Sequence, residues 1–192
     1  FLAGIVGAAA GHRRENGGRA QLHFLLRSGL HSDHYFQAAL LLQYAELASQ
    51  LCAEMAKPWA NEKIDVVLSP AIGGIVVGQE VGKALKTRAI FAEKDDQSNL
   101  ILRRGFSLKP GERVLIAEDV VTKGGRVQQT IDLARSFGAI PVGVTVMVDR
   151  SQGGAKFDVP FKSLLKLSLQ TFDPADCPLC REGKPLVHPG SK

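Results

Sequence analysis

Cysteine is scarce in this 192-residue sequence, which has only three: Cys52, Cys177 and Cys180. Three cysteines in a chain of this length exclude a fold built on a disulfide framework, and they favour a reducing compartment, which we expect to be the cytoplasm. Long apolar runs are also lacking, because no segment approaches the roughly 18 apolar residues that a membrane-spanning helix needs. The composition, with 45% hydrophobic and 22% charged residues, instead predicts one soluble globular domain with a substantial core.

The net charge of +5 does not by itself choose a partner. A basic chain can bind nucleic acid, but a small polyanionic substrate explains the same charge balance equally well. The opening segment Phe1–Gly11 is apolar and lacks the basic leader of a signal peptide, and we expect it to form the first turns of an N-terminal helix. Because the chain begins with Phe rather than Met, further residues are expected ahead of it.

Short apolar runs alternate with segments of helical periodicity from residue 64 onward. Ile64–Ser69 and Arg88–Lys94 are predicted strands, and Gly74–Lys86 between them has apolar residues at helical spacing. A hairpin arm, a central strand, a helix over Arg126–Ala139 that stops at Gly138, and two further strands follow. This alternation predicts an α/β fold with an open, mostly parallel sheet and flanking helices. We expect a single domain over 1–192, with an N-terminal subdomain at 1–60, a core at 61–170 and a tail at 171–192.

Three loops that contain glycine are predicted at the carboxyl ends of these strands, which is where open α/β sheets bind ligands. Their sequences are SPAIGG at 69–74, EDVVTKGG at 118–125 and DRSQGG at 149–154. In the second loop, a turn from strand to helix can aim backbone N–H groups and a helix N-terminus at an anion. The adjacent carboxylates Glu118 and Asp119 could then accept hydrogen bonds from sugar hydroxyls. The alternative is that the two acidic residues only solvate a strand end and cap a helix.

The segment VLIAEDVVTKGG (114–125) closely resembles the signature of the type I phosphoribosyltransferases. In that family the acidic pair holds the ribose hydroxyls of phosphoribosyl pyrophosphate (PRPP), and the following loop holds its 5-phosphate. The resemblance makes Glu118, Asp119 and Lys94 the expected catalytic residues. The expected PRPP-binding residues are Ile72, Gly73, Lys94, Glu118, Asp119, Val120, Val121, Thr122, Lys123, Gly124 and Gly125.

Three further segments resemble the orotate phosphoribosyltransferases within that family. RSGLHSDHYFQ (27–37) is similar to their N-terminal base loop, VDRSQGG (148–154) to the segment with their orotate-contacting arginine, and CPLCREGKPLVHPGSK (177–192) to the tail of a bacterial subgroup. The resemblance implies that orotate is bound by Arg27, Tyr35, Phe36, Thr122 and Arg150. Residues 1–60 would then be the base-binding subdomain and residues 61–170 the PRPP-binding core. Taken without the resemblance, Tyr35 and Phe36 are better explained as core residues of an ordinary strand.

The implied reaction is the pentosyl transfer of ribose 5-phosphate from PRPP to orotate, which yields orotidine 5-monophosphate and pyrophosphate on the route to UMP. Mg2+ is the implied cofactor, held mainly by PRPP and water rather than by protein ligands. The resemblance also implies a homodimer with shared active sites, in which a mobile loop carrying Lys94 closes over the neighbouring site. Some positions differ from the family pattern: Gly73 stands at a usual lysine, Glu93 at a usual arginine, and Arg27 at a usual lysine.

Two other functions are open at this stage. One is a phosphoribosyltransferase for a purine or uracil, against which the base loop and Arg150 argue. The other is a regulator that kept the fold and binds nucleic acid. The pair Cys177 and Cys180 could form half of a four-ligand zinc site, with His188 as a third ligand and a metal shared across a dimer. We favour a reduced structural thiol pair, because no fourth ligand is evident.

Overall fold

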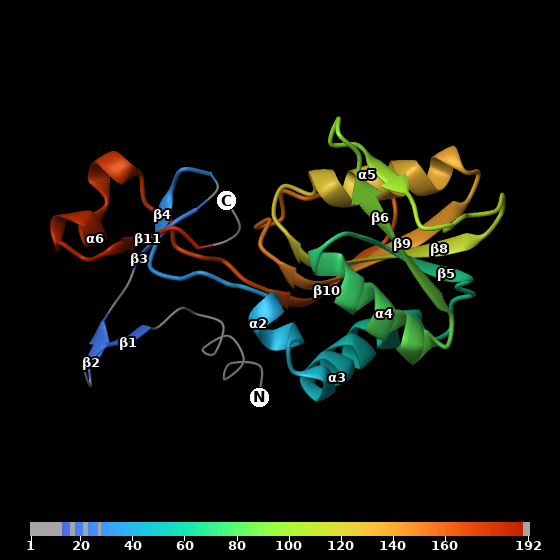
Figure 1. Cartoon of the computed structure of the whole chain (residues 1–192), viewed down its shortest axis with the longest axis horizontal. Coiled ribbons are helices and arrows are strands. Elements are labelled where there is room, and N and C mark those ends of the chain that lie inside the picture. Colours follow the sequence, from blue (N-terminus) through green and yellow to red (C-terminus); the bar gives the residue numbers. More distant parts are fainter. Residues whose placement is uncertain (1–12, 16–17, 21–22, 27, 190–192) are drawn as a thin grey trace. The chain divides into compact units, whose positions relative to one another are not determined.

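The computed structural model describes residues 13–15, 18–20, 23–26 and 28–189, which belong to two compact units (Figure 1). The first unit combines Phe1–Leu41 with Ser168–Lys192, and the second unit is Leu42–Leu167. The expected subdomain boundaries near residues 60 and 170 stay predictions. The expected helix over Phe1–Gly11 lies outside the described residues.

The second unit is built on a six-stranded sheet with the strand order β10-β9-β8-β5-β6-β7. Its strands are β5 (Val66–Pro70), β6 (Arg88–Lys94), β7 (Leu100–Leu102), β8 (Arg113–Val121), β9 (Ile140–Asp149) and β10 (Phe161–Lys166). Every neighbouring pair in this sheet is parallel except β6 and β7. This arrangement confirms the prediction of an open, mostly parallel sheet.

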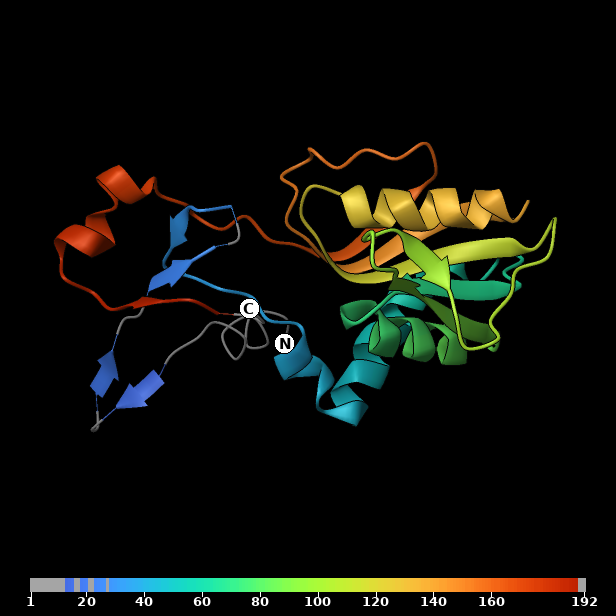
Figure 2. The same ribbon diagram turned by 45° about the horizontal axis from the view of Figure 1, so that its top comes forward.

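Helices cover both faces of this sheet. Helix α5 (Gly125–Ser136) lies on one face, and α3 (Ala45–Ala56) and α4 (Gly73–Leu85) lie on the other (Figure 2). A short 3-10 helix, η1 (Lys57–Trp59), follows α3. Gly138 adopts the left-handed conformation just after α5, and Ala139 N–H donates to the Ala134 carbonyl, so the predicted helix stop is confirmed.

The connections of β5 and β8 run in opposite directions across the sheet. The chain leaves β5 through α4 toward β6, whereas it leaves the adjacent β8 through α5 toward β9. The two crossover helices lie on opposite faces, so the carboxyl ends of β5 and β8 form a topological switch point. In open α/β sheets a ligand crevice forms at such a point.

The first unit brings segments from both ends of the chain into one small sheet. Its strands are β3 (His23–Leu25), β4 (His31–Ser32) and β11 (Leu186–Val187), in the order β11-β3-β4. Strand β3 is antiparallel to β4 and parallel to β11. The remaining elements are the paired strands β1 (Arg13–Glu15) and β2 (Gly18–Ala20), the 3-10 helix η2 (Pro174–Asp176), helix α6 (Pro178–Arg181) and helix α2 (Ala39–Leu42), within which the two units meet in sequence.

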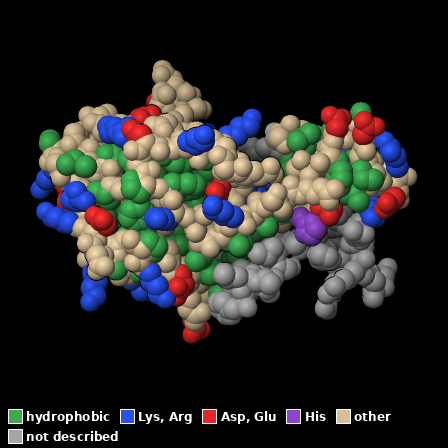
Figure 3. Space-filling model, turned by 180° about the vertical axis from the view of Figure 1, so that it is seen from behind, with side chains coloured by type: hydrophobic (Ala, Val, Ile, Leu, Met, Phe, Trp, Pro, Cys, Tyr) green, Lys and Arg blue, Asp and Glu red, His purple; other side chains and the backbone are tan. Residues whose placement is uncertain are grey.

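Charged side chains of both signs lie on the surface. On the face shown in Figure 3, Lys and Arg side chains are interspersed with Asp and Glu. Several form ion pairs, such as Arg88 with Glu112 at 2.8 Å and Arg135 with Asp158 at 2.7 Å. Among the described residues, no helix has both the length and the apolar character needed to cross a membrane.

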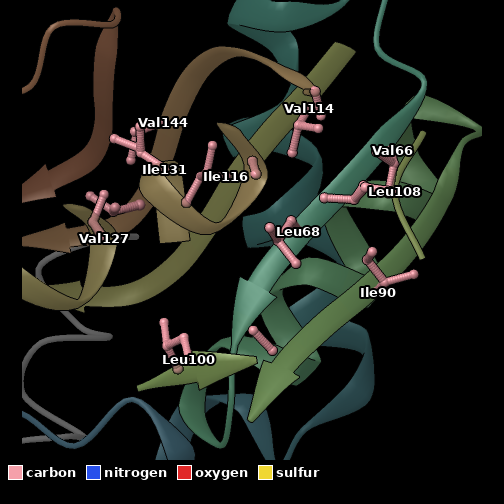
Figure 4. Close-up of a cluster of buried hydrophobic side chains, with 14 of the residues drawn as sticks. Val66, Leu68, Ile90, Leu100, Leu108, Val114, Ile116, Val127, Ile131 and Val144 are labelled. Carbon is pink, nitrogen blue, oxygen red and sulfur yellow. The ribbon is translucent and has the colours of Figure 1, made fainter. Parts of the chain in front are cut away.

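One apolar cluster fixes the sheet against α5. It includes Val66 and Leu68 of β5, Val114 and Ile116 of β8, and Val144 of β9, all fully buried (Figure 4). Helix α5 contributes Val127 and Ile131, which are one turn apart and therefore share a face. Because β5, β8 and α5 pack through the same cluster, the loops at the carboxyl ends of these strands start from a rigid base.

Candidate active site

Three loops leave the same edge of the sheet around the switch point. Strands β5, β8 and β9 are adjacent and parallel, so the loops that follow them start side by side. Strand β8 ends with the sequence EDVV (118–121), and the Val121 carbonyl accepts a hydrogen bond from the Arg150 N–H of the loop after β9, at 2.8 Å. The expected convergence of the three glycine-containing loops is therefore confirmed.

The two adjacent carboxylates differ in their surroundings. Glu118 is only 4% exposed, and its Oε1 accepts a hydrogen bond from the Asp119 N–H at 3.1 Å. Asp119 is half-buried, and its Oδ1 accepts from the Val120 N–H at 2.7 Å. Both carboxylates are therefore oriented by the backbone at the end of β8.

Glu118 is held in an environment that disfavours its charged form. Burial raises the pKa of its carboxyl group well above the ordinary value, and the nearby negative charge of Asp119 adds to the rise. The positive charge of Arg126 acts in the opposite direction. A buried carboxyl group beside a second one, at a topological switch point, is the kind of perturbed group that marks functional sites.

The N-terminus of α4 lies directly against the acidic pair. A Cβ atom at Gly73 would collide with the carboxylate of Asp119, and one at Gly74 would lie 3.2 Å from Glu118 Oε1. The adjacent Ala71–Ile72 peptide bond is cis, and the Ile72 side chain is 85% exposed. Of the two residues expected from the SPAIGG loop, Gly73 therefore lies beside the acidic pair, and Ile72 immediately precedes it with an exposed side chain.

The loop after β8 leads directly into α5. Gly124 has a φ of 81°, which favours glycine, and a Cβ atom at Gly125 would meet open space. Thr122 and Lys123 are exposed. Open backbone at the first turn of a twelve-residue helix is able to present N–H groups to an anion.

Arg126 is a site residue that the sequence reasoning missed. Its Nη1 donates to the carbonyl of Ala71 at 2.8 Å, so it joins the start of α5 to the loop after β5. A cation in the first turn of a helix is disfavoured by the helix dipole. That placement was the available signal that Arg126 has an anionic or carbonyl partner.

Residues 31–175 match the family model of the phosphoribosyl transferase domain. An orotate phosphoribosyltransferase of Caldanaerobacter subterraneus subsp. tengcongensis is 49% identical over 170 residues, which cover 88% of this chain and 89% of that protein. An orotate phosphoribosyltransferase of Carboxydothermus hydrogenoformans is 48% identical, covering 88% of this chain and 90% of that protein. The chain belongs to the orotate phosphoribosyltransferase family.

Solved structures share the fold of this family member. A crystal structure of Mycobacterium tuberculosis orotate phosphoribosyltransferase has a TM-score of 0.69 at 22% identity, covering 86% of this chain and 94% of that chain. An adenine phosphoribosyltransferase from Thermoanaerobacter pseudethanolicus has a TM-score of 0.66 at 15% identity, covering 85% and 99%. Since enzymes named for two different bases share the fold, the fold alone does not choose the base.

The residues expected to bind orotate are divided between the two units. Thr122 and Arg150 lie in the second unit, at neighbouring loops of the switch-point edge. Tyr35 and Phe36 lie in the first unit, where Phe36 is buried and the half-buried Tyr35 packs against Phe24 with ring centroids 5.8 Å apart. Arg27 lies outside the described residues. The orotate-binding roles of all five residues stay predictions.

The expected lid segment forms a tight hairpin. Strands β6 and β7 pair antiparallel, and Asp95 Oδ1 accepts from the N–H groups of Gln97 and Asn99 at 2.9 and 2.8 Å. Lys94 is exposed at the end of β6. Arg104, in contrast, makes a bidentate pair with Glu93 at 2.7 and 2.9 Å, and this pairing lowers the pKa of Glu93. Lys94 is thus the better candidate for a cation that reaches a substrate.

Proposed function

We propose that this chain transfers ribose 5-phosphate from PRPP to N1 of orotate and releases orotidine 5-monophosphate and pyrophosphate. The observation that carries the proposal is the acidic pair Glu118 and Asp119 at the switch point, in a chain 49% identical to a protein named orotate phosphoribosyltransferase. A pentosyltransferase of this kind acts in pyrimidine biosynthesis.

The acidic pair would bind the ribose of PRPP. Glu118 and Asp119 offer acceptor oxygens held by backbone N–H groups, and each can receive a ribose hydroxyl. Displacement at the anomeric carbon develops oxocarbenium character, which a nearby carboxylate stabilises electrostatically. A buried site strengthens this effect because water is excluded from it.

The loop from Thr122 to Gly125 would bind the 5-phosphate. The open backbone at the start of α5 supplies N–H donors, and the helix dipole adds partial positive charge. The exposed Lys123 and the hydroxyl of Thr122 add a cation and a donor. Val120 and Val121 would be contacted through the backbone at the end of β8.

The leaving pyrophosphate would lie over Ile72, Gly73 and the N-terminus of α4. Mg2+ suits this site because carboxylate and phosphate oxygens are the hard donors that it prefers, and PRPP and water would supply most of them. When bound, Mg2+ supplies charge neutralisation for the pyrophosphate. Lys94 would add a cation as the site closes, and we propose that it acts on the neighbouring subunit of a homodimer.

In the second unit, orotate would be recognised by Arg150 and Thr122, and the base-binding roles expected of Tyr35, Phe36 and Arg27 stay predictions. A guanidinium can donate paired hydrogen bonds to the orotate carboxylate. Uracil has no carboxylate and cannot accept them. A base-binding role for Arg150 is supported by the hydrogen bond from its backbone N–H to the Val121 carbonyl. Val121 directly precedes the proposed phosphate loop, which begins at Thr122.

A screen of five bases tests the proposed function. The purified protein is incubated with PRPP and Mg2+ and with orotate, uracil, adenine, hypoxanthine or xanthine, and pyrophosphate release is measured. Release with orotate at a rate at least tenfold above that with each other base is expected, since tenfold corresponds to only about 1.4 kcal/mol of discrimination. A preference for a purine or uracil would overturn the assignment of the base, and no release with all five bases would overturn the enzymatic function.

A further inference from the structure

Four side chains from distant parts of the sequence converge in the first unit. His23 begins β3, His31 begins β4, Cys177 precedes α6, and Cys180 lies within α6. Their ligand atoms, one from each residue, all lie within 4.8 Å of one another. Cys180 Sγ is 3.3 Å from His23 Nε2 and 3.3 Å from His31 Nδ1.

These separations are close to those of a tetrahedral metal site. Zinc binds sulfur at about 2.3 Å and imidazole nitrogen at about 2.0–2.1 Å, which places neighbouring ligand atoms of a tetrahedron roughly 3.3–3.8 Å apart. The chain therefore needs only small side-chain adjustments to surround an ion. Cys180 is exposed, which leaves a path for entry, whereas His23, His31 and Cys177 are buried.

The part of the first unit that the structure describes buries few apolar side chains. Its three-stranded sheet has strands of only two or three residues. Small units that bury little apolar surface are commonly stabilised by a metal or by disulfides. The four side chains would tie the two segments of this unit to each other, because the histidines come from one segment and the cysteines from the other.

We propose that His23, His31, Cys177 and Cys180 bind one structural Zn2+ ion. Two thiolates and two imidazoles form a closed four-ligand set of the kind found in structural zinc sites, and they are too soft for Mg2+. Each cysteine thiol releases its proton to solvent when the metal binds. His188, considered from the sequence as a third ligand, is exposed and does not belong to this group among the described residues.

The test measures zinc in the full-length protein and in matched variants. The native chain, grown with zinc and dialysed against metal-free buffer, is expected to retain one zinc per chain by elemental analysis. Cys180→Ser should lower the zinc content at least tenfold. Cys52→Ala and His34→Asn should each retain one zinc, because neither residue belongs to the cluster. A native chain without zinc, or a Cys180→Ser variant with full zinc content, would overturn the proposal.

A second measurement covers the case in which a ligand variant does not fold. The native chain is stripped with a chelator and reloaded with Co2+ alone, and its absorption spectrum is recorded. The visible bands of tetrahedral cobalt and a thiolate charge-transfer band are expected at one cobalt per chain, and added Zn2+ should abolish them. A spectrum without these bands, or a mass showing a Cys177–Cys180 disulfide in the protein as purified, would contradict the site. Neither readout depends on orotate or PRPP, so failure of the enzymatic function would leave both interpretable.

Discussion

The carboxylate of Asp119 occupies the space that a side chain at position 73 would need. A Cβ atom built on Gly73 collides with this carboxylate. The first residue of α4 therefore has no room for a side chain while the Asp119 carboxylate keeps its position. In this structure, glycine allows the N-terminus of α4 to approach the acidic pair closely.

Gly73→Ala is expected to lower kcat/KM for PRPP about 10- to 100-fold, because displacing a positioned group by about 1 Å has effects of that size. Steady-state kinetics at varied PRPP measures the loss. Val76→Ala, at an exposed position of the same helix, is the control and should stay close to the native value. Native kinetics in Gly73→Ala would show that the close approach of α4 to Asp119 is not needed for the use of PRPP.

Glu118→Gln is expected to stabilise the protein at neutral and alkaline pH. Because folding raises the pKa of Glu118, the unfolded chain binds fewer protons above the ordinary value of 4.5, and stability falls as the pH rises from there toward the folded pKa. Glutamine removes that loss. A gain in Tm of about 2–4 °C at pH 8 corresponds to roughly 1 kcal/mol in a domain of this size.

The pH dependence of this gain is the decisive part of the measurement. The difference in Tm between Glu118→Gln and the native protein should shrink toward zero near pH 4. There the Glu118 carboxyl group is largely protonated in the folded state and in the unfolded state. Glu54→Gln, at a surface ion pair, is the control and should leave Tm nearly unchanged at pH 8. A Glu118→Gln variant that is less stable than the native protein at pH 8 would contradict the raised pKa.

Arg150→Ala is expected to impair the use of orotate while PRPP binding stays nearly unchanged. Loss of a charge-assisted hydrogen bond is worth about 1.5–3 kcal/mol, so kcat/KM for orotate should fall about tenfold or more. Calorimetric titration with PRPP is the parallel readout, and Arg135→Ala at the end of α5 is the control. An equal loss of PRPP affinity in Arg150→Ala would show that Arg150 acts through folding or through the overall electrostatic potential of the site, and not through recognition of the base.

Lys94 is expected to act in the active site of the neighbouring subunit. Lys94→Ala and Asp119→Asn, each nearly inactive alone, are mixed under conditions that exchange subunits. A mixed dimer then has one site with both lesions and one site with neither, so about half of the native activity per mixed dimer should return. The Arg104→Ala variant alone should retain activity, because Arg104 forms an ion pair with Glu93. Proven exchange without recovery would place Lys94 in its own subunit's site.

The sequence predicted the parts of this site that are local in the chain. Glu118, Asp119 and the loop after them are contiguous, and hydrophobic periodicity was enough to place them at the carboxyl end of a buried strand. The stop of α5 at Gly138 followed from one residue with special backbone freedom. Such features depend on short-range sequence, which is why they could be predicted.

Contacts between distant segments were not predicted. The donation from Arg126 to Ala71 and the crowding of Gly73 by Asp119 depend on how β5 and β8 pair. The two histidines beside Cys180 are separated from it by 157 and 149 residues, so spacing along the chain gave no sign of them. The sequence therefore favoured a simple thiol pair and considered His188, the nearest histidine in the sequence.

The most direct measurement of the central claim is the loss of orotate, followed by its ultraviolet absorbance, with PRPP and Mg2+ present. The account predicts a steady loss that stops when PRPP is withheld and falls at least about tenfold in Asp119→Asn, because a charge-assisted hydrogen bond to ribose is lost. Formation of orotidine 5-monophosphate should equal the orotate consumed. Unchanged absorbance in the complete mixture, with protein shown to be folded, would contradict the account.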